Sequence, residues 1–130
     1  MEYMLDTDTC SYIIKKVPEV LQAFSNHLET CCISSVVYQE LMVGLVGVRG
    51  TKHEEAYVEF MRLIKVIPFS QTDALAAADF MVSNKKMGHN IGVIDNQIAG
   101  QAANSGLTLV TNNTNHFAPM AGLEITSWVG

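Results

Sequence analysis

The feature that most constrains this chain is the alternation of short apolar runs with longer segments of helical periodicity. Four runs that are largely apolar throughout are predicted to be buried strands, and a shorter fifth run follows them: residues 3–5, 30–33, 66–69, 107–110 and 123–125. Strands that do not alternate polar with apolar residues are typical of a parallel sheet covered on both faces. The pattern therefore predicts a three-layer α/β/α sandwich with a four- to five-stranded parallel sheet.

Between these runs, apolar residues recur at helical spacing. The predicted helices cover residues 10–16, 18–28, 34–45, 53–64, 72–86 and 94–104. A turn is expected at residues 88–92, and residues 111–115 form a polar stretch after the fourth strand. With 130 residues and no linker-like segment, we expect one domain, residues 1–130.

Charge and composition exclude several classes of protein. Eight Lys and Arg against thirteen Asp and Glu give a net charge of −5, unlike a generic basic nucleic-acid binder. Hydrophobic residues make up 48%, which excludes a disordered chain, and a mean hydropathy of +0.19 predicts apolar surface covered by a partner. The three cysteines fit no disulfide framework or Cys-x-x-Cys pair, and the N-terminus lacks a signal peptide's positive charge, so we expect the cytoplasm.

Four acidic residues are candidates for a shared site at one edge of the predicted sheet. Asp6 comes directly after the first strand, and Asp8 shares that sheet edge if the chain stays extended. Asp95 precedes a helix, and Glu40 lies in mid-helix one turn before Gly44, whose missing side chain would admit a phosphate or a second chain. Helix capping for Asp8 and Asp95, and a solvated position for Glu40, are the structural alternatives.

Asn112 and Asn113 follow the fourth strand at the same sheet edge, where ligands bind in such folds. Carboxylate and amide oxygens suit Mg²⁺ or Mn²⁺. A pair of such ions activates water and stabilises the leaving oxygen of a phosphodiester.

Five segments, in order, resemble the motifs of PIN-domain toxins of the VapC type. They are MLDTDTCSYII (4–14), ISSVVYQEL (33–41), IGVIDNQIA (91–99), VTNN (110–113) with His116-Phe117, and LEITSW (123–128). The resemblance implies a PIN-like fold and a Mg²⁺- or Mn²⁺-dependent endoribonuclease that cuts tRNA or ribosomal RNA. It also implies a homodimer and a small antitoxin whose C-terminal segment covers the site.

The same resemblance assigns the catalytic and metal-binding positions to Asp6, Glu40, Asp95 and Asn113, with Asp8, Asn112 and Thr111 as auxiliary residues. Asn113 stands where many relatives carry Asp, and Asp8 where Asn is common. We therefore expect a weaker second cation, with the charge of Asp8 in partial compensation.

Three other functions are alternatives to this one, and the sequence disfavours two of them. The loss of charge at Asn113 is compatible with a catalytically weakened PIN domain that only binds RNA or protein. A phosphoacceptor receiver domain would need Asp after the third strand, where residues 68–70 read Pro-Phe-Ser, and a DNA-flap nuclease usually has a longer, more basic chain.

Some side chains have two interpretations. Met42, Val43, Leu45 and Val46 give the Glu40 helix excess apolar surface, for an antitoxin or equally for the core or a dimer interface. His116 could approach RNA, and the cysteines are expected in the core.

Overall fold

The computed structural model describes residues 1–129. The strands over this range are β1 (Tyr3–Leu5), β2 (Cys31–Ser34), β3 (Lys65–Ile67), β4 (Thr108–Val110) and β5 (Ile125–Thr126). The helices are α1 (Thr7–Ile14), α2 (Pro18–Asn26), the 3₁₀ helix η1 (Leu28–Thr30), α3 (Ser35–Gly47), α4 (Glu54–Leu63), α5 (Gln71–Lys86), α6 (Val93–Ser105) and α7 (Thr114–Phe117).

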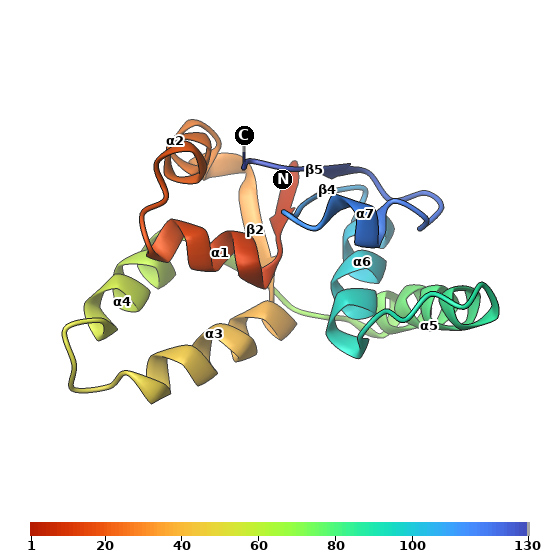
Figure 1. Cartoon of the computed structure of the whole chain (residues 1–130), viewed down its shortest axis with the longest axis horizontal. Coiled ribbons are helices and arrows are strands. Elements are labelled where there is room, and N and C mark those ends of the chain that lie inside the picture. Colours follow the sequence, from red (N-terminus) through yellow and green to blue (C-terminus); the bar gives the residue numbers. More distant parts are fainter. Residues whose placement is uncertain (130) are drawn as a thin grey trace.

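All five strands run parallel, in the order β3-β2-β1-β4-β5. In β1, Tyr3 pairs with Cys31 of β2 on one side and with Thr108 of β4 on the other. Helices α1 to α4 lie to one side of the strands and α5 to α7 to the other (Figure 1). The predicted α/β/α sandwich is confirmed, and its sheet has five strands, within the predicted four to five.

The core is formed where the helices cover this sheet. Met4 and Leu5 of β1 and Leu109 and Val110 of β4 are completely buried, which is why these strands read as continuous apolar runs. The three cysteines are free and buried, as expected. Burial raises the pKa of Cys31 to about 12 and of Cys32 to about 11, so both are inert thiols.

Helices α5 and α6 pack unusually closely. A side chain at Gly100 of α6 would place its Cβ 2.5 Å from the backbone nitrogen of Ala77 in α5. Only glycine permits this approach of two helix backbones. The contact fixes α6 against its neighbour and thereby fixes the acidic residue at its start.

Several element boundaries differ from the sequence prediction. Helix α1 begins at Thr7, with Asp6 as its N-cap, so Asp8 lies in the first helical turn and the chain does not stay extended there. Strand β3, at the edge of the sheet, ends at Ile67, and the next residue, Pro68, has no N–H to donate to the ladder. The polar stretch 111–115 was predicted without a helix, yet α7 begins within it at Thr114.

The role expected for Gly44 is wrong. The space beside it is filled by Tyr57 of α4, whose hydroxyl oxygen lies 2.7 Å from where a Cβ would stand. The glycine accommodates a side chain of this chain rather than a phosphate. On the same helix Met42 packs against the core, whereas Val43 and Val46 are 70% and 54% exposed.

Over residues 1–129, none of the helices is both long and apolar enough to cross a bilayer.

Candidate active site

A pocket lies at the point where the sheet topology reverses direction. From β1 the chain proceeds to β2 and β3 on one side, and later returns to β4 on the other. Ligands in open parallel sheets bind outside the carboxyl ends of the strands at this position. The pocket has a volume of about 450 Å³ and is lined by Asp6, Thr7, Asp8, Glu40, Gly92, Val93, Ile94 and Asp95.

Asp6 is the most constrained of these acids. It follows β1 directly, is only 6% exposed, and accepts a hydrogen bond from the backbone nitrogen of Thr9 at 2.8 Å. Burial raises the pKa of Asp6 above its usual value, while hydrogen bonds from Thr111 and Thr9 oppose that rise. The fold thus holds a carboxylate in a place that penalises its negative charge.

Glu40 reaches the same pocket from α3. The hydroxyl of Thr7, in the first turn of α1, donates a hydrogen bond to Oε1 of Glu40. The contact joins α1 to α3, and its two residues are 33 positions apart in sequence. Thr7 therefore holds the Glu40 side chain toward Asp6 and restricts its rotamers.

Asp95 lies in the first turn of α6, rather than before the helix as predicted, and the next residue anchors that turn. The buried amide of Asn96 donates to the carbonyl oxygens of Ile91 at 3.3 Å and Gly92 at 3.1 Å. It accepts from Asn84 of α5 at 2.9 Å. This amide pair secures the entry to α6 and with it the position of Asp95.

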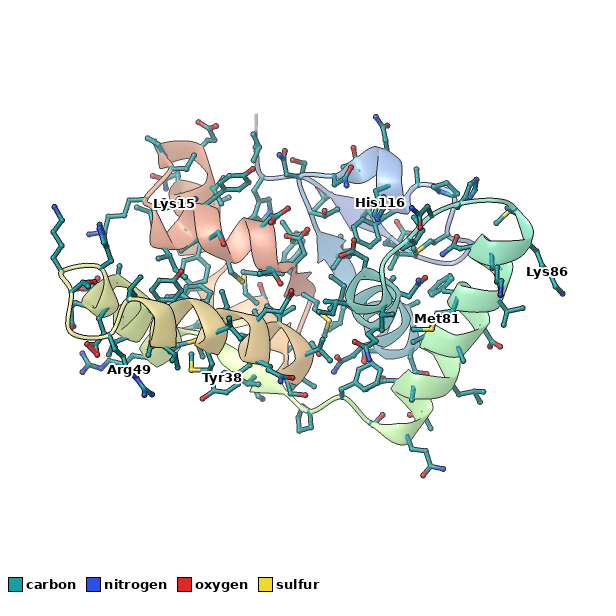
Figure 2. The ribbon with its side chains drawn as sticks, turned by 60° about the horizontal axis from the view of Figure 1, so that its bottom comes forward. Lys15, Tyr38, Arg49, Met81, Lys86 and His116 are labelled. Atoms are coloured by element: carbon teal, nitrogen blue, oxygen red, sulfur yellow. The ribbon has the colours of Figure 1, made fainter. Side chains whose placement is uncertain are left out.

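Asp95 also contacts a residue that was not assigned to the site. Nε2 of His116, in α7, lies 3.0 Å from Oδ2 of Asp95. Phe117 is 2% exposed and fixes α7 on the core, which places the neighbouring His116 on the side of α7 that faces α6 (Figure 2).

The predicted residues after β4 do not all enter the pocket. Thr111 is buried and close enough to Asp6 to lower the pKa of that carboxyl, whereas Asn112 is exposed and donates to the hydroxyl of Tyr12 at 3.3 Å. Asn113 is exposed and is not one of the residues that line the pocket; its backbone nitrogen donates to Thr111 at 3.0 Å. Its role as a ligand stays a prediction.

The donor set of the pocket fits a hard divalent cation. Its titratable members, Asp6, Asp8, Glu40 and Asp95, offer only carboxylate oxygens, and a cation would relieve the penalty that burial imposes on Asp6. Within residues 1–129 no three His, Cys, Asp or Glu side chains are close enough to hold an ion as they stand. Glu40 and Asp95 are turned to Thr7 and His116, so binding requires small side-chain rearrangements.

A second hollow of about 450 Å³ continues from this pocket between α3 and α6. Glu40 and Ile94 line both, and Val36, Gln39, Val43 and Gln97 complete the second. A ligand in this trough would contact apolar surface and reach the acids at one end.

Sequence reasoning identified the four acids of the pocket but missed the residues that hold them. Asn84 and Asn96 were given no role, Thr7 was considered only for capping a helix, and His116 was considered as a contact to RNA and, with less support, as a general acid. Glu40, the partner of Thr7, and Asp95, the partner of His116, are distant from them in sequence, whereas Asn96 bonds the nearby Ile91 and Gly92 and directly follows Asp95. That adjacency to an assigned acid was the one local signal for Asn96.

Comparison with known proteins gives a consistent result. The family model described as "PIN domain" matches residues 3–123. The chain is 32% identical to the "tRNA(fMet)-specific endonuclease VapC" of Salmonella typhimurium, with 98% of each chain covered. It is 30% identical to "Ribonuclease VapC2" of Haemophilus influenzae, with 99% of each covered.

Solved structures agree with these sequence matches. The chain matches a structure of VapBC2 from Rickettsia felis bound to a promoter DNA fragment, with a TM-score of 0.88, 27% identity, and coverage of 98% of this chain and 99% of that one. It matches DNA-bound VapBC from Salmonella typhimurium with a TM-score of 0.85, 28% identity and 98% of each chain covered.

Proposed function

This chain belongs to the PIN domain family, and from that premise we propose that it is the endoribonuclease toxin of a type II toxin–antitoxin pair. Its substrate is RNA, and the name of the Salmonella typhimurium relative favours a transfer RNA. Its partner is a small antitoxin, because the similar solved structures are VapBC complexes. The buried free thiols are compatible with a reducing cytoplasm, where we place the protein.

The observation that carries this proposal is the meeting of four carboxylates in one pocket at the switch point of the sheet. They come from three segments, after β1, in α3 and at the start of α6. A purely structural explanation accounts for Asp6 as a helix cap, but it gives Glu40 and Asp95 no reason to face the same space. Hydrolysis of a phosphodiester does give one.

We assign Asp6, Glu40 and Asp95 to hold a divalent cation, Mg²⁺ or Mn²⁺, with Asn113 as a fourth donor and Asp8 as an auxiliary one. When bound, such an ion lowers the pKa of a water molecule and offsets the charge of a phosphate group. Asn113 supplies an amide oxygen where many relatives carry a carboxylate, so a second ion is expected to bind more weakly.

The remaining residues position these donors. The backbone of Thr9 holds the Asp6 carboxylate and Thr7 holds Glu40. Asn96 fixes the turn that carries Asp95, and Thr111 favours the charged form of Asp6 by lowering its pKa. These contacts limit the conformations of each acid before RNA arrives, so that Glu40 and Asp95 are the acids that reorient when the cation binds.

The negative charge of the protein constrains how RNA approaches it. With a net charge of −5, the pocket would repel phosphates unless a cation compensates its acids. Lys15 and Arg49 lie at the end of the molecule away from α5 (Figure 2), and there they can contact phosphates beyond the cleaved one.

For the antitoxin we propose the trough between α3 and α6, where the exposed Val43 is part of the lining and the exposed Val46 lies about one turn farther along α3. A segment lying there would cover apolar surface and place a basic side chain beside the acids. We also propose that the toxin forms a homodimer.

The function is tested by incubating purified protein with transfer RNA and Mg²⁺ or Mn²⁺, and then with excess EDTA. Specific cleavage that requires the cation is expected, and Asp95→Asn should abolish it while the circular dichroism spectrum stays unchanged. RNA that is bound but never cut, with either cation, would contradict the enzymatic proposal and favour a weakened binding module.

A further inference from the structure

His116 occupies a position that its sequence did not reveal. Its Nε2 lies 3.0 Å from Oδ2 of Asp95, with the two side chains 24% and 41% exposed. Both side chains are therefore partly exposed at the surface, where small solutes such as metal ions can reach them. His116 does not line the pocket of the four acids, but an ion held by Oδ2 of Asp95 would lie within reach of its imidazole nitrogen.

The spacing of the two atoms matches that of neighbouring ligands around one ion. Two donors at right angles, each about 2.1 Å from a six-coordinate cation, are separated by about 3.0 Å. Nε2 and Oδ2 already have this separation without a cation between them. Nε2 would bind the ion as part of a neutral imidazole whose one N–H proton is on Nδ1. An imidazolium reaches that form by losing the Nε2 proton to solvent, and a neutral ring reaches it when solvent takes the proton from Nε2 and returns one to Nδ1.

The chemistry of the donor then decides which ion is preferred. Mg²⁺ takes oxygen ligands and keeps several waters, whereas imidazole suits first-row transition ions and adds affinity for them. A site made only of carboxylates and amides lacks this contribution of a nitrogen ligand. One nitrogen ligand at the edge of the site adds a preference for a first-row transition ion.

We propose that His116 is a ligand of the cation and that it makes the site prefer Mn²⁺ over Mg²⁺. The inference rests on the proposed function, because it uses the same site, and it adds a fifth segment, α7, to the residues that bind the ion. Phe117 anchors α7 to the core, so the imidazole is presented by a fixed element and not by a free loop.

The decisive measurement is electron spin-echo envelope modulation of Mn²⁺ bound to the full chain. A coordinated imidazole gives modulation from its nitrogen, which carboxylates and water do not give. The expected result is nitrogen modulation in the wild type, its loss in His116→Gln, and its retention in His53→Gln. His53 is an exposed control outside the pocket.

Affinity gives a second readout. Calorimetry should show that His116→Gln weakens Mn²⁺ binding by about tenfold, the scale of losses around metal ligands, and changes Mg²⁺ binding much less. A wild-type spectrum without nitrogen modulation overturns the proposal and needs no variant that might misfold. Modulation that persists in His116→Gln overturns it as well.

These outcomes are separate from those that test the proposed function. If His116 is not a ligand, RNA cleavage in Mg²⁺ still requires Asp95, and the nuclease assignment stands. If Asp95→Asn cleaves RNA normally, the nuclease assignment fails whatever the Mn²⁺ spectrum shows.

Discussion

The carboxylate of Asp6 accepts a hydrogen bond at 2.8 Å from the backbone nitrogen of Thr9, so one side chain both caps α1 and faces the acidic pocket. An N-cap oxygen satisfies an otherwise unpaired N–H of the first turn. The two roles have different chemical requirements, since a cap needs any suitable oxygen and a cation needs a carboxylate. Substitutions can therefore separate them.

We predict that Asp6→Asn and Asp6→Ala both lose RNA cleavage, whereas only Asp6→Ala loses the cap. Asn is as good a cap as Asp, and replacement by Ala typically costs about 1 kcal/mol of stability. Urea denaturation of the two variants side by side measures this difference. Equal stabilities would show that the Thr9 contact does not stabilise α1.

The burial of Asp6 also predicts a dependence of stability on pH. A raised pKa means that the folded state binds the Asp6 proton more tightly than the unfolded state, so stability from this group is present at low pH and is lost as pH rises through the raised value. In EDTA at pH 7, Asp6→Asn should have a higher urea midpoint than the wild type. The gap should shrink toward about pH 4, near the usual pKa. A wild type more stable than Asp6→Asn at pH 7 would contradict this reasoning.

Gly100 should be irreplaceable for packing alone. In Gly100→Ala the added methyl meets the backbone of Ala77, which is not free to move aside, and overpacking of this kind costs about 1–3 kcal/mol. Gly47→Ala, at the end of α3 with open space around it, is the matched control and should gain up to about 1 kcal/mol. Denaturation midpoints that fall equally in both variants would rule out the close helix contact as the cause.

Asn113→Asp should lower the concentration of Mg²⁺ or Mn²⁺ needed for half-maximal cleavage, because it adds a carboxylate where the second cation is expected to bind. The expected change appears in a metal titration of the cleavage rate at fixed RNA. Asn112→Asp, on the exposed neighbour that bonds Tyr12, is the control for added charge alone. If both variants respond alike, general electrostatics and not ligation explains the effect.

The antitoxin surface can be tested on α3. Val43→Glu and Val46→Glu change exposed side chains, so the fold should persist while antitoxin affinity falls at least about tenfold, or about 1.4 kcal/mol. Leu75→Glu, 67% exposed on α5, is the control and should bind normally. Calorimetry measures affinity, and cleavage of free RNA verifies that the site is intact. Full affinity in both α3 variants would place the antitoxin elsewhere.

Much of the fold was predictable because its cause is local. Buried parallel strands leave continuous apolar runs, and helices leave a 3.6-residue period, so nearly every element could be located from sequence. Asp6 and Asp95 were found because they follow or open such elements. Helix α7 was missed because four residues are too few to show a period.

What escaped prediction depends on packing between distant segments. The residues around Gly44 in the sequence do not indicate that Tyr57 fills the space beside it. The residues around Thr7 do not indicate that its hydroxyl donates to the carboxylate of Glu40. The outward direction of Val43 rather than Met42 likewise follows from how α3 is rotated against the core. The spacing of residues along one helix does not reveal that rotation.

The order of the strands has a consequence for folding during synthesis on the ribosome. The central strand β1 is synthesised first, but it can pair with β4 only when residues 108–110 have emerged from the ribosome. Thr111, which lowers the pKa of Asp6, emerges after them. Asp95 itself belongs to the last third of the chain. The pocket of a nascent chain therefore cannot assemble until residues 1–111 have all left the ribosome, and any cleavage of RNA that depends on this pocket can begin only after that point.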